Sequence, residues 1–268
     1  MRSLLLALAV VLPAAAQERP AEEPIETPIL VPSPIPVGFL IAWKPSILSV
    51  RTDSALGSRY GSDKLQPLRF LARYTTTLLR EKLLARAELE GGQFRTDTQG
   101  GSDPNTILLG SDGYDVTAHL LGGTATRIAQ GFTITASAGF ITRYQRGRAA
   151  SGAPSIGIFG VTSNMELEFR VAPIITLSLF VEGGLTPFSY GAQSNLGDLA
   201  DASEVRTRGL ASIDLTKDMA VDVGFDFTRW HASFTNSTIL GAAASDRALL
   251  IESREHALTL GLRFKPQR

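Results

Sequence analysis

The stretch Met165-Glu-Leu-Glu-Phe-Arg-Val171 decides the fold, because its apolar and charged side chains alternate without exception. Alternation with a period of two is typical of a β-strand, in which successive side chains point to opposite faces. One face of this strand suits hydrocarbon and the other suits water. Similar alternation recurs from about residue 66 to the C-terminal region, so the chain is predicted to be all-β.

The first 36 residues are predicted to lie outside the folded domain. Residues 1–16 combine a positive charge at Arg2, a short apolar run and three alanines, which is the pattern of a secretory signal peptide cleaved near Ala16. Residues 17–36 contain six prolines and are expected to form an extended periplasmic leader. Residues 37–268 then form the domain to be explained.

Composition narrows the class of protein. The chain has no cysteine, which argues against a disulfide scaffold and against a lipid-modified cysteine at the mature N-terminus. Its 26 basic and 26 acidic residues balance, so no basic excess indicates a nucleic-acid partner. No later stretch reaches the roughly 18 uninterrupted apolar residues that predict a spanning helix. An exported chain of amphipathic strands can then cross a membrane only as a closed β-barrel.

Ten strands are predicted, and their connections alternate in length. The expected strands are 37–50, 66–79, 82–95, 107–126, 131–145, 156–171, 174–187, 203–215, 219–232 and 249–264. Tight turns separate every second pair, whereas the connections 51–65, 96–106, 146–155, 188–202 and 233–248 are longer and rich in small and polar residues. Short periplasmic turns, long extracellular loops and an even strand number characterise bacterial outer-membrane barrels. The pattern therefore predicts an antiparallel up-and-down transmembrane β-barrel.

Two segments leave alternatives open. Leucines at helical spacing between Leu68 and Leu89 would allow an amphipathic helix, which would reduce the barrel to eight strands. Strict alternation within residues 83–90 favours strands instead. Pro45 interrupts the first predicted strand, which is then either a short strand with a bend or a segment tucked against the barrel.

Over residues 37–264 the chain resembles the small outer-membrane β-barrels of Gram-negative bacteria as a class. The stretch from His256 to Phe264 is similar to the assembly signal that such proteins present to the insertion machinery. Aromatic residues also fall near predicted strand ends, as in an aromatic girdle: Trp43, Phe140, Tyr144, Phe188, Tyr190, Trp230 and Phe264. The resemblance implies an outer-membrane location, and as partners it implies outer-membrane lipid, lipopolysaccharide and the barrel-assembly machinery.

The inward face of the predicted strands carries charges of both signs. The predicted lumen-lining residues are Arg86, Glu88, Glu90, Arg143, Glu166, Glu168, Arg170, Glu182, Arg206, Arg208, Asp222 and Asp226. These side chains could line a narrow hydrophilic pore that selects solutes. They could equally fill the barrel as a salt-bridged ladder, because about eight strands leave an interior just wide enough for side chains. The filled barrel is the favoured interpretation.

One local pattern indicates chemistry. His231 and Ser233 are predicted to face outward near the extracellular end of a strand, with Asp246 across the next loop. A His-x-Ser pair facing lipid is similar to the catalytic pair of the outer-membrane lipid A deacylases. That resemblance implies His231 as general base, Ser233 as nucleophile and Asp246 as the orienting acid. Those enzymes usually have Asn after the Ser, where this chain has Phe234.

A second enzymatic alternative is an outer-membrane protease, which would need paired Asp and Asp-His groups at the extracellular rim. His231 with Asp226, or Asp112 with Asp115, are the candidates for that role. The sequence has no Gly-rich phosphate loop, HExxH motif or cysteine cluster, so we expect no cofactor and no metal. The favoured expectation is a non-enzymatic barrel with a structural, adhesive or narrow passive-channel role.

Overall fold

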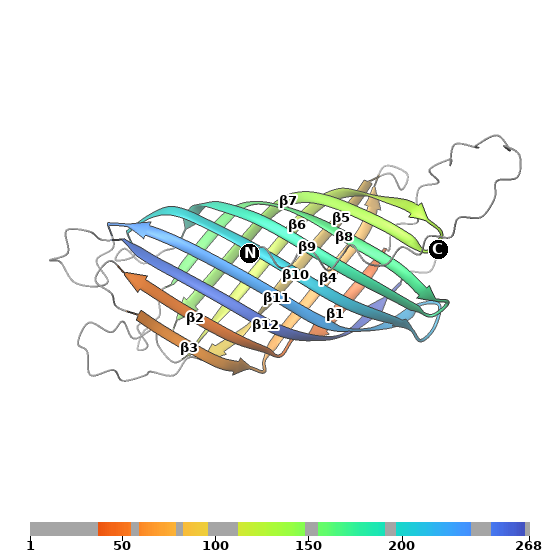
Figure 1. Ribbon diagram of the computed structural model, residues 1–268, viewed down its shortest axis with the longest axis horizontal. Coiled ribbons are helices and arrows are strands. Elements are labelled where there is room, and N and C mark those ends of the chain that lie inside the picture. Colours follow the sequence, from red (N-terminus) through yellow and green to blue (C-terminus); the bar gives the residue numbers. More distant parts are fainter. Residues whose placement is uncertain are drawn as a thin grey trace, which may run out of the picture. The chain divides into compact units, whose positions relative to one another are not determined.

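The computed structural model describes residues 37–54, 59–78, 83–95, 112–147, 155–190, 197–236 and 248–265, which lie within one compact unit. These residues form one antiparallel sheet of twelve strands (Figure 1). The strands are β1 (Gly38–Trp43), β2 (Ser46–Ser54), β3 (Arg59–Gln66), β4 (Arg69–Leu78), β5 (Leu83–Arg95), β6 (Asp112–Ala129), β7 (Phe132–Gly147), β8 (Ile156–Ala172), β9 (Ile175–Tyr190), β10 (Asp198–Asp214), β11 (Met219–Thr235) and β12 (Leu249–Phe264). The described part contains no helix long and apolar enough to span a bilayer. The predicted signal peptide and Pro-rich leader lie outside the described residues.

The sheet closes on itself, so the fold is an antiparallel β-barrel as predicted. Strands β4 to β11 each pair with the next strand in the chain, and β1 pairs with β4 on one side and with β12 on the other. The ring therefore contains ten strands, β1 and β4 to β12, which tilt strongly around the barrel wall (Figure 1). Closure leaves no free sheet edge around this ring.

The first two predicted strands are each interrupted once. After β1 the chain bends at Lys44-Pro45 and continues as β2, which pairs with the first half of β12 and with β3. The interpretation of 37–50 as a short strand with a bend therefore holds. The prediction that 51–65 is a connection is wrong, because most of it lies in β2 and β3. Its polar sequence reads as a loop, whereas the antiparallel pairing of β2 with β12 and with β3 makes most of it strand.

The ten-strand prediction is confirmed, and the eight-strand alternative is wrong. The leucine-rich segment forms β4 and β5, which pair from Arg69↔Gly92 to Leu78↔Leu83. Tight turns at 130–131, 173–174 and 215–218 join consecutive strands at one end of the barrel. Gly131 has a φ of 79°, a left-handed conformation that glycine adopts at little cost.

Several strands extend further than predicted at the opposite end. β10 begins at Asp198 and β11 ends at Thr235, so parts of the predicted connections 188–202 and 233–248 are strand. β7 likewise runs to Gly147, past the predicted end at 145. At these ends the apolar side chains, such as Ala202 and Phe234, face inward and the outward side chains are polar, so the alternation is the reverse of that in the apolar belt.

Along each strand, the side chains alternate between the outer surface and the interior of the barrel. Large apolar side chains on alternate positions are exposed on the outer surface, among them Leu120, Phe140, Met165, Leu179, Phe225 and Leu260. Their neighbours in the chain are buried inside the barrel, and many of these are charged. The interior of this barrel is therefore polar over most of its length, whereas the outer belt is apolar.

Candidate functional site

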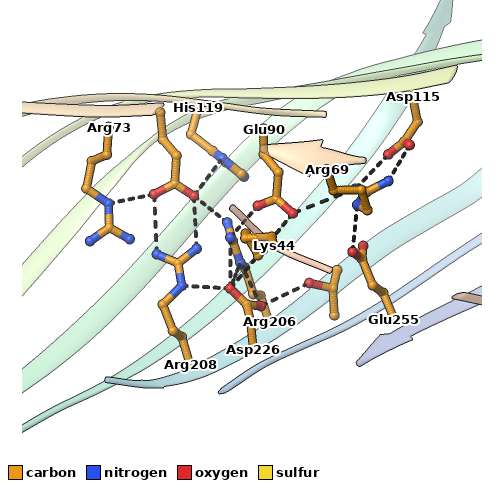
Figure 2. Close-up of polar contacts among 12 residues, drawn as sticks. Lys44, Arg69, Arg73, Glu90, Asp115, His119, Arg206, Arg208, Asp226 and Glu255 are labelled. Atoms are coloured by element: carbon orange, nitrogen blue, oxygen red, sulfur yellow. Dashed lines mark hydrogen bonds and ion pairs between the residues drawn. The ribbon is translucent and has the colours of Figure 1, made fainter. Parts of the chain in front are cut away.

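The central part of the barrel interior holds a cluster of ion pairs, which we call the central ion cluster. It consists of Lys44, Glu88, Glu90, Arg206, Arg208 and Asp226, all of them buried. Alternation within each strand places these side chains: Glu88 and Glu90 lie two apart on β5, and Arg206 and Arg208 lie two apart on β10. Figure 2 shows how the labelled members of this cluster, Lys44, Glu90, Arg206, Arg208 and Asp226, converge inside the wall.

Arg206 joins opposite sides of the barrel. Its Nη1 lies 2.5 Å from Glu88 Oε1, and its Nη2 lies 2.6 Å from Glu90 Oε2 and 3.0 Å from Asp226 Oδ2. In the ring of ten strands, β5 and β10 are five positions apart in both directions. Contact between Arg206 and Glu88 therefore spans the whole lumen.

Arg208 and Lys44 complete the central ion cluster. Arg208 Nε lies 2.6 Å from Asp226 Oδ2, and its Nη2 lies 3.2 Å from Glu88 Oε1. Lys44 Nζ lies 2.6 Å from Glu90 Oε1 and 3.1 Å from Asp226 Oδ2. Three bases thus face three acids, and each acid contacts at least two bases.

Further ion pairs surround the central ion cluster. Arg69 contacts Asp115 through Nη1 at 2.5 Å and Glu255 through Nε at 2.8 Å. Arg73 Nε lies 2.8 Å from Glu88 Oε2. With these residues the group contains five bases and five acids, so its formal charge is zero without counting His119 (Figure 2). Such a network is costly to break, since removal of one partner leaves an uncompensated buried charge.

Other pairs link strands that are not neighbours. Arg86 on β5 contacts Glu166 on β8 at 2.6 Å, and Arg143 on β7 contacts Glu204 on β10 at 2.9 Å. His119 Nε2 lies 3.1 Å from Glu182 Oε1. These contacts fix long side chains across the lumen instead of leaving them to line an open channel.

The turn end of the interior contains a small pocket. It has space of about 30 Å³, enough for one or two water molecules. Its lining includes Arg73, Arg86, Glu166, Glu168 and Arg263. This space is far smaller than the roughly 300 Å³ at which small-molecule pockets begin.

A layer of buried apolar side chains lies inside the barrel near the end opposite the turns. We call it the mouth cluster, and it consists of Ile156, Ile158, Ala202, Trp230, Ala232, Phe234, Leu249 and Ile251. Trp230 is only 1% exposed, so its assignment to an outer aromatic girdle is wrong. It lies on the same face of β11 as Asp226, which points inward. The Arg143 guanidinium lies 5.7 Å from the Trp230 ring and links the charged and apolar layers.

The outer surface of β10 and β11 carries the predicted histidine and serine. His231 Nδ1 lies 3.1 Å from Ser203 Oγ, and its Nε2 lies 3.2 Å from Asp201 Oδ2. Ser233 Oγ instead donates to the Asp201 carbonyl oxygen at 3.4 Å. The hydroxyl bonded to the imidazole is therefore that of Ser203, which pairs with His231 across the strands.

The predicted lumen-lining residues fall into three groups. Nine are buried: Arg86, Glu88, Glu90, Glu166, Glu182, Arg206, Arg208, Asp222 and Asp226. Arg143 and Glu168 are partly buried inside the wall. Arg170 is exposed at the end of β8, where it donates to the Pro173 carbonyl oxygen of the adjoining turn.

Sequence reasoning missed some residues that matter to the interior. Lys44 was not assigned, because Pro45 obscured the phase of the first strand. Leu40, Ala42, Lys44 and Ser46 occupy alternate positions, and all four are buried. Continuing the phase of the strand through Pro45 would therefore have placed Lys44 inside the barrel. Of the enzymatic candidates, Asp246 and the side chain of Asp112 lie outside the described residues. Asp226 and His231 lie on opposite faces of β11.

No metal-binding group is seen in the part of the chain that the structure describes. No three His, Cys, Asp or Glu side chains there are placed to hold one ion. Asp115, named as a candidate acid for proteolysis, is occupied by a bidentate contact with Arg69.

Comparisons with known proteins give structural likeness only. No protein-family model matches the chain, and no curated protein resembles it in sequence. The outer membrane protease OmpT from Escherichia coli is 12% identical, with a TM-score of 0.49 over 88% of this chain and 99% of that protein. The translocator domain of the autotransporter NalP from Neisseria meningitidis is 8% identical, with a TM-score of 0.43 over 85% and 88%. The outer membrane protein OprG from Pseudomonas aeruginosa is 10% identical, with a TM-score of 0.37 over 87% and 97%.

Proposed function

We propose that the protein is an integral outer-membrane barrel whose lumen is closed to solutes, and that its role at the cell surface is structural or adhesive. The observation that carries this proposal is the contact of Arg206 on β10 with Glu88 and Glu90 on β5. Opposite walls of the barrel touch through these side chains. The mouth cluster adds a second, apolar layer that a hydrated solute would have to displace.

The outer belt supports a membrane location. On β11 the outward side chains Val221, Val223, Phe225 and Phe227 are apolar, and the stretch from Met219 to Thr228 is ten residues long. A tilted strand needs about 9–11 residues to cross the hydrocarbon core. The charged interior and apolar exterior reverse the arrangement of a water-soluble domain, which places its apolar side chains inside. We therefore place the turn end in the periplasm and the other end outside the cell.

Fractionation and liposome swelling test this proposal. The mature chain should fractionate with outer membranes and show different apparent sizes in boiled and unboiled detergent samples. Proteoliposomes should swell in isosmotic arabinose no faster than vesicles of lipid alone. The double variant Arg206→Gly/Glu88→Gly is the matched control, since it removes one pair that spans the lumen. Recovery from the periplasm would contradict the membrane location, and rapid swelling of the wild type would contradict the closed lumen.

A hydrogen-bonded chain on the outer surface supports a second candidate function, hydrolysis of an ester in an outer-leaflet lipid. Ser203 Oγ, the His231 ring and the Asp201 carboxylate follow one another at 3.1 and 3.2 Å. With Nε2 protonated toward Asp201, Nδ1 is free to accept the serine proton, as a general base does. Mass spectrometry of lipid A tests this candidate: an acyl chain should be lost with the wild type and retained with Ser203→Ala or His231→Ala. Unchanged lipid A in cells that express the wild type would exclude it.

A further inference from the structure

Two arginines lie on the outer surface directly above the apolar belt. Counted from the turn end, Met219–Thr228 on β11 and Phe264–Glu255 on β12 are each ten residues, which matches the span of the hydrocarbon core. Arg229 and Arg254 are the next residues on these strands, and both are outward and half exposed. They stand where the phosphates of outer-leaflet lipid would lie.

These arginines face each other across the two strands. Arg229 pairs directly with Arg254 in the register of β11 and β12. Like charges opposite one another in an antiparallel pair are unfavourable. A single carboxylate holds them together: Glu252 Oε1 lies 2.8 Å from Arg229 Nε and 2.9 Å from Arg254 Nε. We call these three residues the rim arginine site.

Among the side chains that the structure describes, the rim arginine site sets two guanidinium groups against one carboxylate. Each arginine side chain is 53% exposed, whereas that of Glu252 is 13% exposed. Within the described ranges, the hydrogen bonds of both guanidinium groups to this carboxylate use Nε. The terminal nitrogens are the forked donors that bind phosphate oxygens in a bidentate manner. Asp201, another acid on this side of the barrel, is bonded to His231.

We propose that the rim arginine site binds a phosphate group of a phosphorylated glycolipid in the outer leaflet. The acyl chains of that lipid would lie against Phe225, Phe227 and Leu258, which are outward on the same strands below the arginines. The phosphate relieves the repulsion between the two guanidinium groups, and the apolar belt binds the rest of the molecule. The inference rests on the proposed membrane location.

Native mass spectrometry of the mature protein in detergent micelles tests the site. The probes are bisphosphorylated lipid A and the same lipid after chemical removal of both phosphates. The site variant is Arg229→Gln/Glu252→Gln/Arg254→Gln, which removes both guanidinium groups together with the carboxylate between them. The matched control is Arg127→Gln/Lys217→Gln, which removes two exposed bases at the opposite end of the barrel. Each variant is first shown to be folded by its shift in apparent size on boiling.

We expect the wild type and the control variant to bind phosphorylated lipid A equally. Removal of the phosphates, or of the arginines, should weaken binding at least tenfold. Equal affinity for both lipids, or an unchanged affinity of the site variant, would overturn the proposal. Displacement of lipid A by an equal concentration of inorganic phosphate would also overturn it, since the site would then recognise free phosphate. A protein that fails to float with vesicles contradicts the membrane location itself, whereas a protein that floats without phosphate preference contradicts only this inference.

Discussion

The barrel interior is occupied in two different ways along its length. In the middle, Arg206 and its partners place matched charges across the lumen, whereas near the end opposite the turns Trp230 and Phe234 belong to a buried apolar cluster. A charged layer depends on every partner being present, because an isolated buried charge is costly. An apolar layer depends on volume and tolerates conservative substitutions. The two layers should therefore respond differently to mutation.

The largest expected effect comes from breaking the charged layer. Arg206→Met leaves Glu88, Glu90 and Asp226 short of one base, and loss of one partner of a buried pair costs about 3–5 kcal/mol. Urea unfolding in detergent micelles should show this loss. Arg127→Met, at an exposed position, is the control and should unfold like the wild type. If Arg206→Met were as stable as the control, the cluster would not hold the interior together.

A core truncation in the apolar layer should have a similar or smaller effect. Ile251 is buried in the mouth cluster, so Ile251→Ala removes volume without stranding a charge. Such changes cost about 2–5 kcal/mol, and Ile251→Val should cost only about 0.5–1.5 kcal/mol. The same urea titration measures both variants. A larger loss of stability in Ile251→Ala than in Ile251→Val would support a layer that depends on packed apolar volume. An equal loss in both variants would argue against it.

A third test asks which side chains of β8 face the outer surface and which face the interior. Leu167 lies on the outer face of β8 between the charged inward positions Glu166 and Glu168. Leu167→Arg should impair assembly and cost about 2–4 kcal/mol near the bilayer midplane. A cysteine at Phe169 should resist a water-soluble thiol reagent that does react with a cysteine at Glu168. Reversed labelling would mean that the register of β8 is shifted by one residue.

The smallest effect is expected for an ion pair on the surface. Lys217 lies 4.0 Å from Asp218 in the turn between β10 and β11, and its side chain is 81% exposed. Exposed pairs contribute about 0–1 kcal/mol, so Lys217→Ala should leave stability nearly unchanged. A loss as large as that of Arg206→Met would show that burial does not separate the two kinds of pair.

Alternation predicted the strands of the apolar belt and the direction of their side chains. Met165 to Val171, for example, faces outward and inward in the expected phase except where Arg170 reaches the turn. Outside the apolar belt this pattern of outward apolar residues ends, so the end of β2, most of β3 and the start of β10 read as loops. Periodicity also cannot show which inward charges meet across the lumen, since Arg206 and Glu88 are 118 residues apart.

The outer site shows the same limit. The His-x-Ser pattern identified His231, but cross-strand pairing brings Ser203 to its imidazole and leaves Ser233 on the backbone of Asp201. Residues two apart on one strand face the same side of the sheet. The residue directly opposite on the next strand also faces that side and lies closer than they do to each other. Register between strands was therefore the missing information.

Single-channel recording in a planar lipid bilayer tests the closed lumen most directly. The folded barrel should insert and give no stable conductance steps, because Arg206, Glu88 and Glu90 join opposite walls and the mouth cluster covers them. Discrete, reproducible conductance steps from the wild-type barrel would contradict a lumen filled by its own side chains.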